Sequence, residues 1–361
     1  MTGRILLDLA PEKGNPRNSE GAFYRLKSGA LRLYYSRFAG DSSADEAYAT
    51  IAYVETLDEG ESWSTPVTVF TARELDAVNI MSVSMMEMGS GDAGLFFLIR
   101  RADGDLRLVL YRSSDDCRTW SGPVCCIPEP GYYVVNNDRV VRLSTGRLLV
   151  PAAFHARTGE GRPPEVTSRA IVRFSYSDDD GATWQMSPNA VSESMRVCRS
   201  GFQEPGVAEL RDGSVYGWAR TDLGRQYEFF SRDGGISWTE AEPAWFTSPC
   251  SPMQTKRMPD GRLLAVWNPI PAYQTRELVV LKENPGRYTD RTRYVLAVSD
   301  DEGETWSEPR IFEDDADAGF SYPAMYFTNA GVFLAYCAGK HTEGGNLCRE
   351  RIRFIPYSEI G

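Results

Sequence analysis

The chain has 361 residues, 42% hydrophobic and 25% charged, a composition typical of a globular protein that excludes a disordered or fibrous one. Lys and Arg number 39 against 50 Asp and Glu, which gives a formal net charge of −11. With this charge and no run of basic residues, we expect no nucleic-acid partner and no general attraction of anionic ligands. No apolar stretch is long enough to span a bilayer, so we expect no membrane partner.

Cysteine and histidine usage narrows the chemistry. The seven Cys are odd in number and scattered, and the two histidines are His155 and His341, so we expect no disulfide framework, no metal site and no cofactor. The first residues contain too short an apolar run for a signal peptide. This favours a cytoplasmic location, although a secreted chain that has lost its signal would look the same.

An eight-residue motif, S/T-x-D-x-G-x-S/T-W, recurs along the chain with a period of about 60 residues. Its Asp and Ser/Thr side chains suit hydrogen bonds to nearby backbone N–H groups, and its Gly allows positive φ, so each copy predicts a tight turn. The spacing does not fit an EF-hand loop, which favours a structural role over calcium binding. The five copies are Thr56–Trp63, Ser113–Trp120, Ser177–Trp184, Ser231–Trp238 and Ser299–Trp306, with Cys117 in place of Gly in the second.

Interleaved with the five copies of this motif, called boxes below, are six further segments. Each consists of an apolar strand, a turn glycine and a second apolar strand. Each alternates apolar and polar residues and predicts a β-hairpin. The last is followed by a strand over Arg351–Pro356, and an early strand over Gly3–Leu9 would complete that sheet and close a ring. We therefore predict one all-β domain, residues 1–361, folded as a six-bladed β-propeller of four-stranded antiparallel blades. The hairpins are Ala22–Tyr35, Met81–Leu98, Tyr133–Ala153, Val207–Ala219, Pro252–Val266 and Pro323–Tyr336.

The box resembles the Asp-box, or BNR, repeat of the sialidase (neuraminidase) superfamily, and the resemblance covers nearly the whole chain. In that family the boxes lie away from the active site. Sialic acid carries a carboxylate on its anomeric carbon, which repels a carboxylate nucleophile. The resemblance therefore implies a Tyr nucleophile activated by a Glu, three arginines that hold the carboxylate, and an Asp on a loop as general acid and base.

The first part of the chain offers three of these residues. In place of the family's short Arg-Ile-Pro motif stands Asn-Pro-Arg17-Asn-Ser-Glu-Gly, whose Arg17 is expected to be the first arginine of the triad. Arg37, at the end of the next strand, matches an arginine that contacts substituents of the sugar ring. In the loop that follows, Asp45 lies eleven residues before the first box and is preferred over Asp41 as the acid and base.

The later hairpins supply the rest. Glu204 precedes Arg220 by sixteen residues, which resembles the family segment that carries the activating Glu and the second triad arginine. Arg291 opens a strand as the third arginine does, and Arg293, two residues on, is the alternative. Tyr322, in Tyr-Pro-Ala-Met, holds the place in its repeat that Glu204 holds in the fourth, and is expected to be the nucleophile.

The other walls of the pocket are expected at the equivalent strand starts. At one of these starts, residues 136–139 form the polar run Asn-Asn-Asp-Arg. A site for sugar hydroxyls and a polar network in the centre of the ring explain this run equally well. The residues expected to bind substrate are Asn79, Met81, Asn136, Asp138 and Gln203.

Together these features favour an exo-α-sialidase-like, retaining glycoside hydrolase that releases terminal sialic acid from a sialylated glycan or oligosaccharide. Two alternatives remain. One is a hydrolase of another acidic sugar, such as a 2-keto-3-deoxy acid or a uronic acid, on the same scaffold. The other is a non-catalytic carbohydrate-binding propeller, which would keep the pocket but not a working Tyr322–Glu204 pair.

Overall fold

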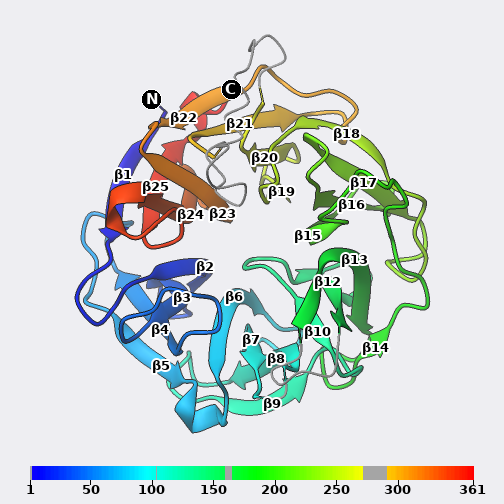
Figure 1. Ribbon diagram of the computed structural model, residues 1–361. Coiled ribbons are helices and arrows are strands. Elements are labelled where there is room, and N and C mark those ends of the chain that lie inside the picture. Colours follow the sequence, from blue (N-terminus) through cyan, green and yellow to red (C-terminus); the bar gives the residue numbers. More distant parts are fainter. Residues whose placement is uncertain (1, 103, 159–164, 271–290) are drawn as a thin grey trace.

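The chain folds into β-sheets, as expected. A computed structural model describes residues 2–102, 104–158, 165–270 and 291–361. Within these ranges the helices are three short 3₁₀ turns, η1 (Arg73–Leu75), η2 (His341–Glu343) and η3 (Tyr357–Glu359), and none is long and apolar enough to cross a membrane. Figure 1 shows the sheets arranged in a ring, with one strand of each near its centre.

Four of the sheets have four strands each, all antiparallel. The strands nearest the centre in Figure 1 are β2, β15, β19 and β23. In sheet order, the strands are β2 (Asn18–Arg25), β3 (Leu31–Phe38), β4 (Ala49–Thr56) and β5 (Val67–Thr71); β15 (Gln203–Glu209), β16 (Val215–Arg220), β17 (Arg225–Ser231) and β18 (Glu242–Thr247); β19 (Gln254–Arg257), β20 (Leu263–Trp267), β21 (Arg293–Ser299) and β22 (Arg310–Asp314); and β23 (Ala318–Phe327), β24 (Gly331–Lys340), β25 (Glu350–Pro356) and β1 (Arg4–Leu9).

The last of these sheets joins the two ends of the chain. β1 pairs antiparallel with β25, with Arg4 opposite Phe354 and Asp8 opposite Arg351. The predicted addition of the early strand to the last sheet is therefore confirmed. The termini consequently lie close together at the rim of the ring (Figure 1).

The remaining strands form one nine-stranded sheet, which differs from the expected separate four-stranded blades. Two antiparallel groups, one from β6 to β9 and one from β10 to β14, are joined by a single parallel pair, Tyr132 with Leu106. The cause is local: Asp105 accepts the Gly131 N–H at 2.9 Å, which holds the start of β10 beside β8. The strands are β6 (Asn79–Glu87), β7 (Ala93–Arg100), β8 (Leu106–Ser113), β9 (Ser121–Cys125), β10 (Tyr132–Val134), β11 (Val141–Arg142), β12 (Leu148–Thr158), β13 (Glu165–Ser177) and β14 (Gln185–Met186).

The five repeated boxes form the same hydrogen-bonded turn. In each, the first Ser or Thr ends a strand and its hydroxyl donates to the box Asp at 2.8 Å. In the third, Asp179 also accepts the backbone N–H of Thr183 at 2.8 Å and its hydroxyl at 2.6 Å. The predicted structural turn is confirmed. Cys117, which replaces Gly, itself adopts a φ of 62°.

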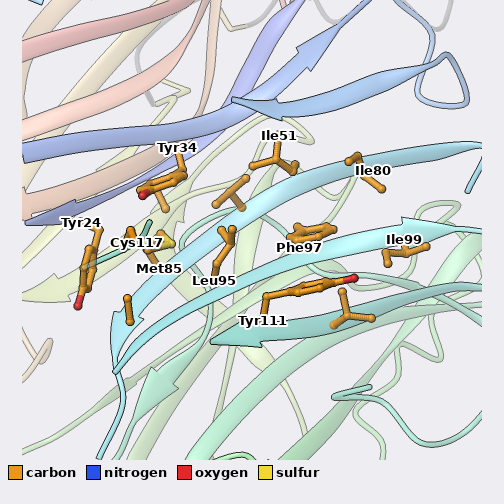
Figure 2. Packing of buried hydrophobic residues seen from close by; sticks show 14 of the residues in the cluster. Tyr24, Tyr34, Ile51, Ile80, Met85, Leu95, Phe97, Ile99, Tyr111 and Cys117 are labelled. Atoms are coloured by element: carbon orange, nitrogen blue, oxygen red, sulfur yellow. The ribbon is translucent and has the colours of Figure 1, made fainter. Parts of the chain in front are cut away.

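Apolar side chains pack between neighbouring sheets and fix the inner strands against one another. Figure 2 shows the cluster between β2–β5 and β6–β9, where Tyr34, Ile51 and Phe97 are fully buried. The rings of Phe97 and Tyr111 stack at 5.4 Å. Each fully buried side chain of this size stabilises the fold by roughly 1.5–3 kcal/mol. This packing holds β2 beside β6, and so places the first residues of both strands together.

Candidate active site

Four inner strands carry the same irregularity. β2, β6, β15 and β23 each have a register shift near their start, as in a β-bulge. Within each bulge one residue has positive φ: Glu20 (61°), Ser82 (59°), Glu204 (48°) and Tyr322 (58°). Such backbone is unfavourable for residues other than glycine and persists where the surrounding structure enforces it. A bulge redirects a side chain, and all four side chains line one cavity.

The space within this cavity and its mouth, which is open to solvent, is about 450 Å³. One part of its wall is apolar, with Met81, Leu98, Leu106 and Val134. The other part is polar. Its residues are Glu20, Asp45, Ser82, Arg100, Tyr132, Asn136, Glu204 and Tyr322. A pocket with an apolar side and a few convergent polar groups is the usual form of a small-molecule site.

Tyr322 and Glu204 form the centre of the polar wall. The Tyr322 hydroxyl donates a 2.8 Å hydrogen bond to Glu204 Oε1, and Arg220 Nη1 lies 2.6 Å from Glu204 Oε2. Gln203 Oε1 accepts from Arg220 Nη2 at 2.8 Å and holds the guanidinium in place. The Arg291 guanidinium lies 5.8 Å from the centroid of the Tyr322 ring.

The protonation of this pair follows from its surroundings. Burial raises the pKa of the Tyr322 phenol well above its usual range, and the neighbouring Glu204 carboxylate raises it further against the opposing Arg220 and Arg291. The phenol is therefore protonated near neutral pH. A phenol that donates to a carboxylate can pass its proton there and become a nucleophile when a substrate arrives.

Arg17 lies behind the cavity wall, with all three guanidinium nitrogens engaged. Its Nε donates to Ser19 Oγ at 2.9 Å, its Nη1 to Asp45 Oδ1 at 2.6 Å, and its Nη2 to Glu20 Oε1 at 2.5 Å. The guanidinium also stacks on Phe38 at 4.4 Å. Arg17 is thus close to the cavity but bound to the protein's own carboxylates.

Several other expected residues lie at or near this cavity. Asp45, Met81 and Asn136 are in its lining, whereas Asp41 is not. Arg293, the alternative to Arg291, pairs with Asp314 at 3.2 Å and is partly exposed. Of the two arginines, Arg291 is therefore the one against Tyr322.

Seven expected substrate-binding residues lie outside the lining: Arg17, Arg220, Arg291 and Gln203, described above, and Asn79, Asp138 and Arg37. Asn79 is fully buried and donates to the Ala47 carbonyl at 2.6 Å. Asp138 has a positive φ of 59°, like the four bulge residues that line the cavity. Its carboxylate, however, accepts hydrogen bonds from Lys256 Nζ at 2.5 Å and from the backbone N–H of Met325. Arg37 pairs with Glu12 at 3.2 Å.

Two charged lining residues, Glu20 and Arg100, had no expected role in the sequence. A signal for Glu20 was present. It lies nine residues before its turn glycine, Gly29, just as Glu204 lies nine before Gly213 and Tyr322 nine before Gly331. Arg100, whose Nη2 donates to the Tyr132 hydroxyl at 2.9 Å, has no such signal.

Within the part of the chain that the structure describes, no group of three or more His, Cys, Asp or Glu side chains is placed to hold a metal ion. The polar wall instead contains three carboxylates, those of Glu20, Asp45 and Glu204, with Arg100 as its cation. Burial raises the pKa of Glu20, and nearby Arg17 opposes this. The arrangement suits proton transfer and nucleophilic attack.

Comparisons with known proteins confirm the resemblance to the sialidase superfamily. The family model described as BNR repeat-like domain matches residues 32–334. A sialidase of Bacteroides fragilis (strain YCH46) is 27% identical over 230 residues, which cover 61% of this chain but 37% of that protein. The chain thus spans little more than a third of this curated relative.

Two solved structures illustrate the fold. A Dyadobacter fermentans protein of unknown function superposes with a TM-score of 0.71 and 18% identity, covering 98% of this chain and 99% of that one. The NanB sialidase of Streptococcus pneumoniae superposes with a TM-score of 0.71 and 11% identity, covering 100% of this chain and 71% of that one. At these identities the likeness is one of fold.

Proposed function

Since the chain belongs to the family of BNR repeat-like domains, we propose that it is an exo-α-sialidase-like glycoside hydrolase with a tyrosine nucleophile. The observation that carries the proposal is the 2.8 Å hydrogen bond from the Tyr322 hydroxyl to Glu204 in a cavity wall. A non-catalytic binding propeller has no need of a buried phenol–carboxylate pair at two strained backbone positions.

The reaction proceeds in two steps with retention of configuration. In the first, Tyr322 Oη attacks the anomeric carbon and its proton passes to Glu204, while Asp45 protonates the departing glycosidic oxygen. In the second, Asp45 takes a proton from water, which attacks the same carbon and releases the tyrosine. The phenolic oxygen then regains its proton from Glu204.

The substrate is a terminal acidic sugar of a sialylated glycan or oligosaccharide. We assign the binding of its carboxylate to Arg220, which contacts Glu204, and to Arg291, which lies over the Tyr322 ring. Met81 and its apolar neighbours face the uncharged part of the ring, and Asn136 a hydroxyl or amide group.

We also propose that residues 1–361 form a single six-bladed propeller domain. In this interpretation the nine-stranded sheet counts as two blades, because one residue pair joins two otherwise complete antiparallel groups.

A second candidate is a hydrolase of a different acidic sugar, a 2-keto-3-deoxy acid or a uronic acid. One observation favours the uronic acid of these two, because its carboxylate is not on the anomeric carbon: Arg17, the expected first arginine of the triad, is held by Glu20 and Asp45. Hydrolysis of such glycosides, but not of α-sialosides, would support it.

The test is release of the fluorophore from a fluorogenic α-sialoside by the wild type, Tyr322→Phe and the control Tyr326→Phe, which alters a tyrosine on the same strand outside the cavity. We expect Tyr322→Phe to lose at least about 1,000-fold in kcat/KM, with the control unchanged. Proton NMR of the first product should show the retained anomer. An inverted product, or full activity without the Tyr322 hydroxyl, would contradict the proposal.

A further inference from the structure

Glu20 occupies the side of Arg17 that faces the cavity. Its side chain is 4% exposed and lines the cavity, whereas Arg17 does not. Glu20 Oε1 accepts from Arg17 Nη2 at 2.5 Å, and Oε2 accepts from the Ser82 hydroxyl. The backbone N–H of Glu20 is itself held by Glu350, at 3.1 Å. The carboxylate is therefore held by two side chains and the backbone of Glu20 by a third, without any ligand.

The bound state of Arg17 has a direct consequence for an anionic ligand. A carboxylate that reached for Arg17 would meet two protein carboxylates already on that guanidinium, Glu20 and Asp45. Like charges at contact distance repel strongly in a poorly solvated site. Asp45 is mostly exposed and lies on a loop, so it can withdraw, but Glu20 is buried on a strand.

We propose that Glu20 is a specificity-determining residue that takes the place of a ligand carboxylate on Arg17 and accepts a hydrogen bond from a ligand hydroxyl instead. The ligand's own carboxylate, if it has one, is then directed to Arg220 and Arg291. The inference rests on the proposed function only in placing a sugar in this cavity, since it concerns binding rather than turnover.

The competing role for Glu20 is positioning. If Glu20 only orients Arg17 for a ligand carboxylate, its neutralisation would weaken the binding of acidic sugars. If Glu20 excludes the carboxylate, its neutralisation would strengthen that binding. The two roles therefore predict opposite signs for the same variant, and neither needs the enzyme to turn over.

The experiment is titration calorimetry with 2-deoxy-2,3-didehydro-N-acetylneuraminic acid, which has no glycosidic bond to hydrolyse, and with its neutral carboxamide. The ratio of the two dissociation constants is compared for the wild type, Glu20→Gln and Glu20→Asn. Gln keeps the shape of the side chain, and Asn tolerates the positive φ at this position best. Glu59→Gln, at an exposed turn outside the cavity, is the control for net charge.

We expect both variants to shift the preference toward the acid by at least about 10-fold, with the control unchanged. A shift toward the amide, an unchanged ratio, or no binding of the acid to either folded variant would overturn the proposal. Loss of catalysis in Tyr322→Phe leaves this result untouched, because the ligand is not hydrolysed. Failure of the proposed reaction and failure of this inference are thus distinguishable.

Discussion

Tyr322 and Glu204 lie 118 positions apart in the sequence, yet the hydroxyl of one donates to the carboxylate of the other at 2.8 Å. Both residues have left-handed backbone, with φ of 58° and 48°, at the same bulge of two different sheets. The repeat thus supplies two equivalent positions that face a common centre, and the chain places a phenol at one and a carboxylate at the other.

The first prediction concerns Glu204 as the base. Glu204→Gln should leave the side chain in place but unable to take the phenolic proton, so kcat/KM should fall by about 10²–10⁴-fold. Glu209→Gln, on the same strand but outside the cavity, is the matched control. Steady-state kinetics with a fluorogenic glycoside measure both. Equal activities of the two variants would show that Glu204 has no role in proton transfer.

The second prediction separates two aspartates of the loop before β4. Asp45 lines the cavity and contacts Arg17 at 2.6 Å, while Asp41 lies outside the lining. Asp45→Asn should lower kcat by about 10²–10⁴-fold, since the general acid is lost. Asp41→Asn should retain wild-type activity. The reverse pattern would transfer the acid and base role to Asp41.

The third prediction concerns the closure of the ring. Glu350 of β25 is fully buried and accepts the backbone N–H groups of Glu20 and Gly21 on β2, at 3.1 and 3.3 Å. Burial raises the pKa of Glu350 to about 8. A raised folded pKa means that its contribution to stability is complete below the usual carboxyl pKa, near 4.5, and is lost as pH rises toward 8.

Denaturant unfolding at pH 5, 6.5 and 8 checks this. The free energy of unfolding of the wild type should fall relative to that of Glu350→Gln as pH rises, by as much as about 1.4 kcal/mol per pH unit. Glu242→Gln, at an exposed position, should follow the wild type. Parallel pH curves for the wild type and Glu350→Gln would exclude a linkage through this carboxyl.

The fourth prediction tests a box turn. The hydroxyl and backbone N–H of Thr183 hold the pKa of Asp179 at about 2. A lowered folded pKa contributes stability above the usual value of 3.8, which is lost as pH falls toward 2. Asp179→Asn should therefore lower the Tm at pH 7, and the difference from the wild type should shrink in acid.

Asp178→Asn is the control for that turn. It makes the same charge change one residue away, where the partner is a surface ion pair with Arg147. Such pairs stabilise little, so its Tm should stay near that of the wild type. A Tm loss in Asp178→Asn equal to that in Asp179→Asn would mean that the box turn has no special contribution.

The sequence predicted the parts of the fold that are local. Each box contains its own donors and acceptors, and each hairpin its own alternation, so turns and strands could be read without tertiary contacts. The pairing of β1 with β25 followed because one sheet lacked a strand. The join between Tyr132 and Leu106 could not be predicted, since it depends on how Asp105 meets the Gly131 N–H in space.

The site was predictable where the repeat marks a position. Glu204 and Tyr322 hold equivalent places, and the structure brings them together. Asn79 begins β6 and Asp138 lies between β10 and β11, but their side chains bind protein partners away from the cavity, which no periodicity reveals. Glu20 was not predicted, because the family's Arg-Ile-Pro motif, in whose place Arg17 stands, contains no carboxylate.

The proposed mechanism depends on a covalent bond between Tyr322 and the sugar. The most direct test is to trap that bond with a sialosyl fluoride that carries a second fluorine beside the anomeric carbon, which slows release of the sugar, and to map the modified peptide by mass spectrometry. We predict one glycosyl adduct, on Tyr322, and none in Tyr322→Phe. An adduct on Glu20, Asp45 or Glu204 in the wild type would contradict it.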